Sequence, residues 1–344
     1  MGLYYHRTVH PPPEVFMKYW ILRRLGSSLI LVLTLMSLVF FLVRLAPGDP
    51  LDQVASAEMS GADRELVRHR LGLDQPLWRQ YGRWLSGVAR WDWGTSLRQQ
   101  RGVADILGEA VPATLLLTAV AFALHLALGL GAGVVMAVSK DGFWGRAVKL
   151  TGLTLYSLPG FWFGLMLILV VSRWLGWLPA GGMSAPDAAF MSGPARFADL
   201  VRHLVLPVCV LALGSFMSTA RYVQASLEEA LGQDYVLTAR ARGLPFARVL
   251  WGHALRNALL PVATQIGLYL PFLLGGAVVV EVVFGWPGMG RVTVEAIRAR
   301  DYPVIMATSS LAASLVVLGS LLADVLYQAL DPRIDLQGRR RRSP

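Results

Sequence analysis

One uncharged run near the N-terminus sets the strongest limit on what this chain can fold into. The segment Gly26–Val43 carries no charged residue, and a helix needs about 20 such residues to cross the hydrocarbon core of a bilayer. Inside lipid, backbone N–H and C=O groups must be hydrogen-bonded within the protein, so a run of this kind folds as a helix. Five further apolar runs follow, and we predict six transmembrane helices. The five further spans are predicted at Val111–Val138, Leu150–Trp177, His203–Val223, Asn257–Phe284 and Val304–Leu330.

The composition supports a membrane protein. Hydrophobic residues make up 55% of the 344 residues and charged residues 16%, whereas soluble domains carry about 25% charged residues. The net charge of +10 does not indicate a nucleic-acid partner, because the arginines cluster beside the apolar spans. Cys209 is the single cysteine and lies within an apolar run, so we interpret it as a small buried apolar residue.

Lysine and arginine are distributed unequally between the two sides of the predicted bundle. Both tails and the short loops on their side carry 17 of these residues, whereas the two short loops on the other side carry 5. The positive-inside rule therefore places both termini and the segment Leu231–Pro261 in the cytoplasm. The long segment between the first two spans is exempt from this rule and lies outside.

These spans divide the chain into five segments. We predict a cytoplasmic tail with an interfacial helix at 1–24, the first span at 25–45, and an extracytoplasmic cap at 46–110. The core at 111–330 holds the other five spans and a coupling loop at 225–256, and a cytoplasmic tail follows at 331–344. Within the cap, aromatic and aliphatic residues recur at helical spacing over Leu77–Val88. We therefore expect a folded cap whose aromatic helix lies near the channel mouth, although packing only within the cap itself is the alternative.

The polar, arginine-bearing segment Leu231–Pro261 separates the fourth and fifth spans. Gly243 divides it into two helical patterns and occupies a position where a helix C-cap needs positive φ. Pro245 suits the first position of the second helix. The residues alone leave two interpretations open: a part that pushes on a partner in the water phase, or a loop lying on the membrane surface. The apolar positions of the two patterns are Tyr235, Val236 and Ala239, then Phe246, Val249, Leu250, His253 and Ala254.

The stretch QDYVLTARARGLPFARVLWGHALRNALLP resembles the cytoplasmic "EAA" loop of bacterial ABC-importer permeases of the dipeptide/oligopeptide/nickel branch. The general motif has Glu-Ala-Ala, three residues, then Gly. Here Leu237, Thr238 and Ala239 precede Gly243, so only the last alanine and the glycine match, and no salt bridge from the acidic position is expected. The resemblance implies a coupling helix that docks on an ATPase subunit. The implied docking residues are Asp234, Tyr235, Leu237, Thr238, Ala239, Arg240, Arg242 and Gly243.

Other segments resemble the same branch in the same order. They are LAPGDP, LGLDQPLWRQYGRWL, DWGTSLR, YSLPGFWFGLMLILVVSRWLGWLPAGG, EVVFGWPGMGRVTVEAIRARDYPV and ALDPRI. The resemblance implies an all-α membrane protein with the type I ABC-importer permease fold, located in the bacterial inner membrane. Its implied partners are a paralogous permease, two ABC ATPase subunits and an extracytoplasmic solute-binding protein. ATP and Mg would be bound by the ATPase subunits, with no cofactor in this chain. Peptides are the favoured substrate, and nickel, glutathione and other small solutes share the branch.

Prolines and paired glycines mark where helices within the membrane bend or approach one another. We expect Pro159, Pro207, Pro261 and Pro271 to interrupt helices. The glycine pairs Gly160/Gly164 and Gly129/Gly133 form small-xxx-small faces that allow close helix contact. The contact could be within this chain or with a second permease subunit, and the residues leave both open. To channel lining or helix packing we assign Pro159, Gly160, Gly164 and Pro261.

Few ionisable residues lie within the predicted spans. We place Arg173 and Glu281 toward the outer ends, where they can snorkel, and Asp324 near the inner end of the last span. His125 lies deepest within a predicted span. We interpret it as a structural histidine whose ring nitrogens are hydrogen-bonded, rather than as a proton carrier. This scarcity disfavours a proton-driven secondary transporter, which usually carries buried acidic or histidine relays.

Motifs of common enzyme chemistry are absent from the sequence. None of the three lysines, Lys18, Lys140 and Lys149, follows a glycine, so the chain has no Walker A loop. There is also no HExxH, CxxC or GxSxG pattern. The competing classes are a stand-alone secondary transporter or channel, which needs no ATPase, and a membrane-anchored scaffold, which moves no solute.

Single cysteines at Gly61 and Gln337, in a Cys209→Ala background, test the predicted topology. We expect a membrane-impermeant thiol reagent to label Gly61→Cys from outside intact cells, because the cap lies outside. The same reagent should label Gln337→Cys only after the membrane is broken. Labelling in the opposite order would reverse the orientation and remove Leu231–Pro261 from the cytoplasm.

Overall fold

The computed structural model describes residues 13–45, 61–70, 72–256, 258–259 and 277–330. These residues form helices joined by loops, and the described part contains only one isolated β-bridge, between Thr95 and Gly102. The predicted all-α class is therefore confirmed. The α-helices are α1 (Pro13–Leu45), α2 (Gly61–Arg70), α3 (Leu77–Val88), α4 (Val103–Val138), α5 (Phe143–Ser157), α6 (Gly160–Leu167), α7 (Gly193–Leu213), α8 (Phe216–Leu231), α9 (Asp234–Ala241), α10 (Phe246–Val249), α12 (Val278–Val283), α13 (Met289–Arg298) and α14 (Tyr302–Leu330). Two π-helical segments, η2 (Ile168–Trp174) and η4 (Leu250–Ala254), and one 3-10 turn, η3 (Ala188–Phe190), complete the set.

Several of these helices are long and apolar enough to cross a membrane. Among the described residues, α4 and parts of α1 and α14 meet this condition singly. The pair α5 with α6 and η2, and the pair α7 with α8, meet it together as bent spans. These five correspond to the first four and the sixth of the predicted spans. The predicted fifth span, Asn257–Phe284, lies mostly outside the described residues, and α12 is its described end.

Two helices begin earlier than predicted. Helix α1 runs unbroken from Pro13, so the predicted interfacial helix and first span form one helix instead of two. Helix α4 begins at Val103 and contains Pro112 within it, whereas the prediction began the span at Val111. The early turns of α4 are helical because their apolar residues, including Val103, are buried in a cluster with Ala296 and other residues of α13 and α14.

The two bent spans break for different local reasons. The chain turns by 103° between α5 and α6, where Pro159 occupies the N-cap of α6 and Leu158 before it is extended, as the residue before a proline prefers. The predicted break at Pro207 is wrong, because α7 continues through it to Leu213. The bend of 47° lies at Gly214–Ser215 instead. There the Ser215 hydroxyl donates to the Leu211 carbonyl at 2.6 Å, a back-bond that often bends helices.

The core depends on close packing of α4 against α8. A Cβ atom on Gly129 would lie 2.9 Å from Thr219, and one on Gly133 would lie 2.5 Å from Val223. The Gly129/Gly133 face therefore makes its contact within this chain. One turn before Gly129, the His125 ring completes the junction, with Nε2 2.8 Å from the Thr219 hydroxyl and Nδ1 2.8 Å from the Ser215 hydroxyl. Both ring nitrogens are engaged, as expected of a satisfied structural histidine.

The predicted aromatic helix of the cap is α3, and it packs on the first span. The Tyr81 hydroxyl lies 2.7 Å from the hydroxyl of Ser37 on α1. The Phe40 ring, fully buried, lies 5.3 Å from the rings of both Tyr81 and Trp84. The alternative of packing only within the cap is therefore wrong. Trp78 of the same helix remains 67% exposed, whereas Tyr81 and Trp84 are half-buried.

A buried aspartate between α13 and α14 holds the rest of the cap against the later part of the chain. Asp301, between α13 and α14, accepts hydrogen bonds from the Ser96 hydroxyl at 2.5 Å, from the Leu97 N–H at 3.1 Å and from the Arg98 N–H at 3.3 Å. Ser96 and Asp301 are both almost fully buried. The cap is thus held at two places, by aromatic packing on α1 and by this carboxylate.

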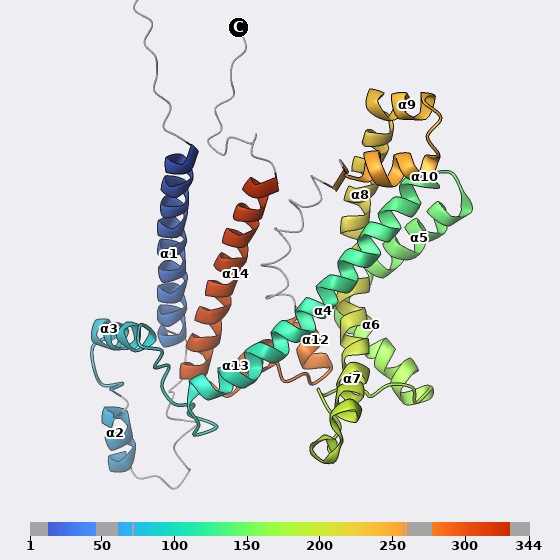
Figure 1. The fold of residues 1–344 in the computed structure, drawn as a ribbon. Coiled ribbons are helices and arrows are strands. Elements are labelled where there is room, and N and C mark those ends of the chain that lie inside the picture. The colour runs from blue at the N-terminus through green and yellow to red at the C-terminus, as the bar shows by residue number, and fades with distance from the viewer. Residues whose placement is uncertain (1–12, 46–60, 71, 257, 260–276, 331–344) are drawn as a thin grey trace, which may run out of the picture.

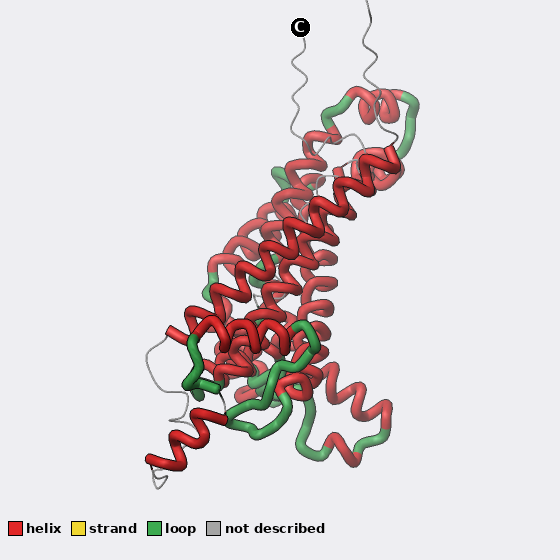
Figure 2. The backbone as a smooth tube through the Cα atoms, turned by 90° about the vertical axis from the view of Figure 1, so that its left-hand side faces the viewer, coloured by secondary structure: helices red, strands yellow, loops and turns green. Residues whose placement is uncertain are grey.

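The long helices run between two distinct ends of the molecule. Figure 1 shows α9 and α10 beyond the ends of α8 and α4, with α3 and α13 at the opposite end. Figure 2 shows the helices running side by side along the bundle, with loop segments gathered at the cap end. The cap and the segment around Gly243 therefore lie at opposite ends of the bundle.

Replacing Asp301 by alanine tests the second attachment of the cap. The change leaves the Ser96 hydroxyl and two backbone N–H groups without their acceptor, and an unpaired buried donor costs about 1–3 kcal/mol. We expect trypsin to cleave detergent-purified Asp301→Ala at Arg98 and Arg101 about tenfold faster than the wild type. Asp92→Ala, in the same cap but exposed, is the control and should leave cleavage unchanged. Equal protection of Asp301→Ala would contradict the attachment.

Candidate functional site

The predicted coupling segment folds as a short helix, a sharp turn and a second helical stretch. Helix α9 follows Gln233, whose extended backbone forms the N-cap. Asp234 lies in its first turn, where a negative charge interacts favourably with the helix dipole. Thr238 donates its hydroxyl to the Asp234 carbonyl at 2.8 Å. The local sequence thus specifies where α9 begins.

Helix α9 ends in a Schellman motif centred on Gly243. The Gly243 N–H donates to the Arg240 carbonyl at 3.0 Å, and the Leu244 N–H donates to the Ala239 carbonyl at 3.4 Å. Gly243 has φ +78°, the left-handed conformation this motif uses. The predicted positive φ is therefore confirmed. No atom lies within 4 Å of a Cβ built there, so backbone conformation alone, and not space, favours glycine.

The inner face of α9 is packed against the ends of the long helices. Val236 is fully buried and Ala239 nearly so. They share one cluster with Leu227 of α8, Ala137 of α4 and Val249 of α10. This packing joins α9 to the ends of α4 and α8. Val236 was not among the predicted site residues, although its apolar spacing to Ala239 marks it as an anchor.

The outer face of α9 is open. Leu237 is 52% and Tyr235 39% exposed, so Tyr235 does not share the buried face with Val236 as predicted, because adjacent helical residues are turned by about 100° from each other. Of the eight predicted docking residues, only Ala239 is buried. The others are exposed: Asp234, Tyr235, Leu237, Thr238, Arg240, Arg242 and Gly243.

The stretch after Gly243 also presents apolar side chains outward. Pro245 is the N-cap of α10 rather than its first residue, as its ψ of 143° shows. Phe246 is 43% and Trp251 63% exposed. The second helical pattern grouped Phe246 and His253 with Val249 and Leu250, but both are exposed. For His253, the π-helical turn η4 changes the spacing of side chains after α10.

An ion pair braces the base of this segment. Lys140, in the α4–α5 loop, lies 3.0 Å from the Glu228 carboxylate on α8. Its hydrogen bond to Glu228 raises the pKa of Lys140, so this side chain stays charged at neutral pH. The pair is largely exposed and therefore contributes little stability. Its geometry ties the loop to the same helix end that carries α9.

The predicted channel and packing residues are distributed differently. Pro159 forms the break before α6. A Cβ on Gly164 would lie 3.2 Å from Phe284, so Gly164 packs within this chain, whereas Gly160 faces open space. Pro261 lies outside the described residues. Among those described, no group of His, Cys, Asp or Glu residues could hold a metal ion.

Glu281 is a buried polar centre that the sequence prediction missed. It was expected to snorkel, but it is fully buried. Its carboxylate accepts from the Thr114 hydroxyl at 2.7 Å and from the Arg291 N–H at 3.0 Å. Gly288 and Gly290 lie so close that a Cβ on either would clash with it. Gly288 and Gly290, which follow Glu281 closely in the sequence, were the signal that could have predicted its burial.

Comparison with known proteins matches almost the whole chain. Residues 129–336 match the family described as binding-protein-dependent transport system inner membrane component, and residues 17–118 match its N-terminal family. The oligopeptide transport system permease protein AppB of Bacillus subtilis (strain 168) is 40% identical over 93% of this chain and 100% of its own length. The di/tripeptide transport system permease protein DppB of Pseudomonas aeruginosa (strain UCBPP-PA14) is 39% identical over 92% and 98%. The glutathione transport system permease protein GsiC of Escherichia coli (strain K12) is likewise 39% identical over 92% and 98%.

Gly243→Val tests whether this glycine sets the direction of α9. A β-branched residue at positive φ costs more than the roughly 1 kcal/mol of alanine. Spin labels at Asp234→Cys and Arg248→Cys, in a Cys209→Ala background, should give a shifted and broader distance distribution in the variant. Gly176→Val is the matched control, since Gly176 also has positive φ with open space around it. An unchanged distribution would show that Gly243 does not orient α9.

Proposed function

Since this chain belongs to the family of binding-protein-dependent transport system inner membrane components, we propose that it is one permease subunit of an ATP-driven importer for peptides. The chain is an integral inner-membrane permease, which the family and its apolar helices support. Relatives named for oligopeptide, di/tripeptide and glutathione transport favour short peptides as the substrate. Glutathione is itself a tripeptide derivative, so one chemical class covers all three.

We propose that the exposed face of α9 docks on an ATPase subunit. The observation that carries this is the asymmetry of α9: Val236 and Ala239 anchor it to α4 and α8, while Leu237 and Tyr235 remain exposed. A helix with exposed apolar side chains at the end of a bundle is suited to enter a groove on a partner. Arginines beside it, such as Arg240, add charge that can fix the register of docking.

The anchoring provides a route by which ATPase movement reaches the channel. Displacing α9 moves α8 directly, because the two share a buried cluster. Helix α8 carries α4 with it through the close contacts at Gly129 and Gly133. The bends before α6 and α8 then let the parts on either side of the breaks change angle. We propose that this unit rocks against a paralogous permease to open the path alternately to each side.

The remaining partners follow from this role. We propose two ATPase subunits that bind ATP and Mg, with no cofactor in this chain, and an extracytoplasmic binding protein that delivers the peptide. In this arrangement both termini and α9 are cytoplasmic and the cap faces the binding protein. A proton-driven secondary transporter has less support, since both ring nitrogens of His125 and the carboxylate of Glu281 are engaged in structural hydrogen bonds.

Co-expression with a second permease, ATPase subunits and a binding protein from the same organism tests this proposal. We expect the chain to co-purify with the ATPase and, in proteoliposomes, to import tri-alanine only with ATP and the binding protein. Gly243→Val should insert normally, while peptide import and peptide-stimulated ATP hydrolysis fall together about tenfold, since a strain of 1–2 kcal/mol changes a two-state ratio by a factor of about 5–30.

Gly176→Val is again the control and should keep both activities. Import without an ATPase would favour a secondary transporter, and co-purification without any solute flux would favour a scaffold. Full coupled transport by Gly243→Val would reduce Leu231–Pro261 to a connecting loop.

A further inference from the structure

Two adjoining cavities lie where both bent spans break. One, of about 390 Å³, lies between α5 and α8, and the other, of about 550 Å³, lies among α5, α6, α7, α8 and α12. They share Tyr156 and Ser218 in their walls. Discontinuous helices at such breaks commonly form substrate sites in transporters. The volumes are those of sites for small ligands.

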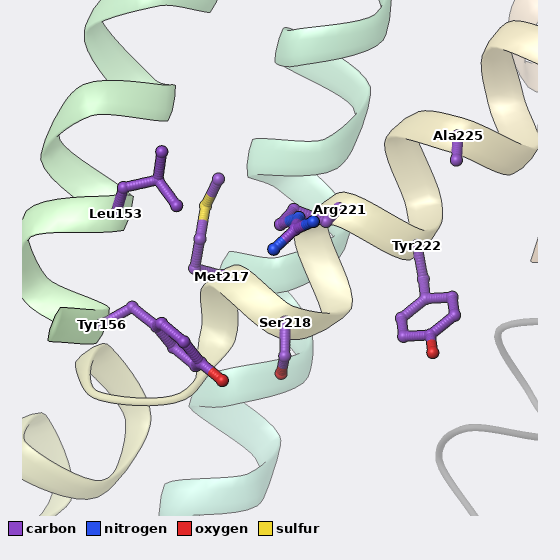
Figure 3. A pocket seen from close by; sticks show the side chains of 7 residues that line it. All are labelled: Leu153, Tyr156, Met217, Ser218, Arg221, Tyr222 and Ala225. Carbon is purple, nitrogen blue, oxygen red and sulfur yellow. The ribbon is translucent and has the colours of Figure 1, made fainter.

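The walls combine aromatic rings, hydroxyl groups and a single positive charge. Figure 3 shows Tyr156 from α5 with Ser218, Arg221 and Tyr222 from α8 around the first cavity. Phe161 and Ser215 line the second. Among the described residues lining either cavity, Arg221 is the only charged one. This is the pattern of a ligand site in which a few polar groups fix one end of the ligand.

Arg221 brings a positive charge to the first cavity. It lies two residues before the end of the predicted fourth span, His203–Val223, and its side chain is exposed in this chain. A charged residue inside a span usually faces a water-filled path or a partner of opposite charge. Its helical neighbours one turn away, Met217, Gln224 and Ala225, are uncharged, so α8 supplies no acid beside it.

A second feature makes the adjoining cavity attractive to anions. Gly160 and Phe161, the first residues of α6, line it. The N-terminus of a helix carries a partial positive charge and free N–H groups. Two independent elements, the α8 guanidinium and the α6 N-terminus, therefore favour negative charge on the two sides of Tyr156.

We propose that these cavities form a transit subsite in which Arg221 binds the C-terminal carboxylate of the transported peptide. This inference rests on the proposed import of peptides. A guanidinium matches the planar carboxylate with two parallel hydrogen bonds, and the Tyr156 hydroxyl in the same wall can donate to this group. Every unmodified peptide ends in a carboxylate, whatever its sequence. Recognition of that end, with aromatic walls for varied side chains, suits a path that must pass many peptides.

The reconstituted importer, with its partner permease, ATPases and binding protein, provides the test. The probes are tri-alanine and its C-terminal amide, each at a concentration that saturates the binding protein. The variants are Arg221→Gln and Arg221→Lys, with Arg146→Gln, an exposed arginine of α5 outside both cavities, as the control. The binding protein's own preference is the same for every variant, so a change in the acid-to-amide import ratio reports on the permease.

We expect Arg221→Gln to import tri-alanine about tenfold more slowly, as for the loss of a hydrogen bond to a charged group. Import of the amide should change little, so the acid-to-amide ratio should fall by the same factor. Arg221→Lys should keep an intermediate ratio because the charge remains, and Arg146→Gln should match the wild type in both rate and ratio.

Three results would overturn the subsite. An unchanged rate and ratio in Arg221→Gln would show that Arg221 does not meet the carboxylate. A slower rate with an unchanged ratio would show that it acts in some other way. Loss of the paired permease from the purified complex, in step with import, would show that Arg221 pairs with an acid of that subunit. If the wild-type complex imports neither peptide, the proposed function itself fails, and this outcome is distinct from the other three.

Discussion

The contact between α4 and α8 is the constraint on which the rest of the structure depends. In a membrane, helices gain little from hydrophobic association with one another, so close approach and interhelical hydrogen bonds stabilise the pair. Gly129 and Gly133 allow the approach, and His125 supplies bonds to Ser215 and Thr219. Because Ser215 also forms the bend between α7 and α8, the same junction fixes where that span breaks. The position of this junction therefore also determines where the cavities beside the break lie and where α9 lies at the end of α8.

The sequence predicted best those features that depend on local chemistry. The positive φ at Gly243 follows from the spacing of two helical patterns around a glycine, and the break at Pro159 follows from proline geometry. The amphipathic helix at Leu77–Val88 was predicted at its observed bounds, because its aromatic residues recur at helical spacing. All-α architecture followed from the length of the apolar runs, which permit only helices in lipid.

Features that depend on distant contacts were not predictable in this way. Pro207 lies inside an unbroken helix, while the break comes at Ser215, whose hydroxyl turns back on α7. Glu281 read as a residue at a membrane edge, yet it is fully buried because Thr114, from a helix far away in sequence, supplies its hydrogen bond. Tyr235 was assigned to the wrong face of α9, since the burial of that helix is decided by α8 and α10. The docking role of α9 itself came from family resemblance, because an exposed amphipathic helix alone does not name its partner.

The attachment of Ser96 to Asp301 has a consequence for how the chain is made. The two residues are 205 positions apart, so the hydrogen bond cannot form until the chain has been synthesised as far as Asp301. At 5–20 residues per second, the cap waits about 10–40 s after its own synthesis for this partner. During that interval the aromatic contacts of α3 with α1, which are local in sequence, are the attachment available to it. The two attachments of the cap thus correspond to an early and a late stage of biogenesis, and only the second requires that the chain has been synthesised through α13.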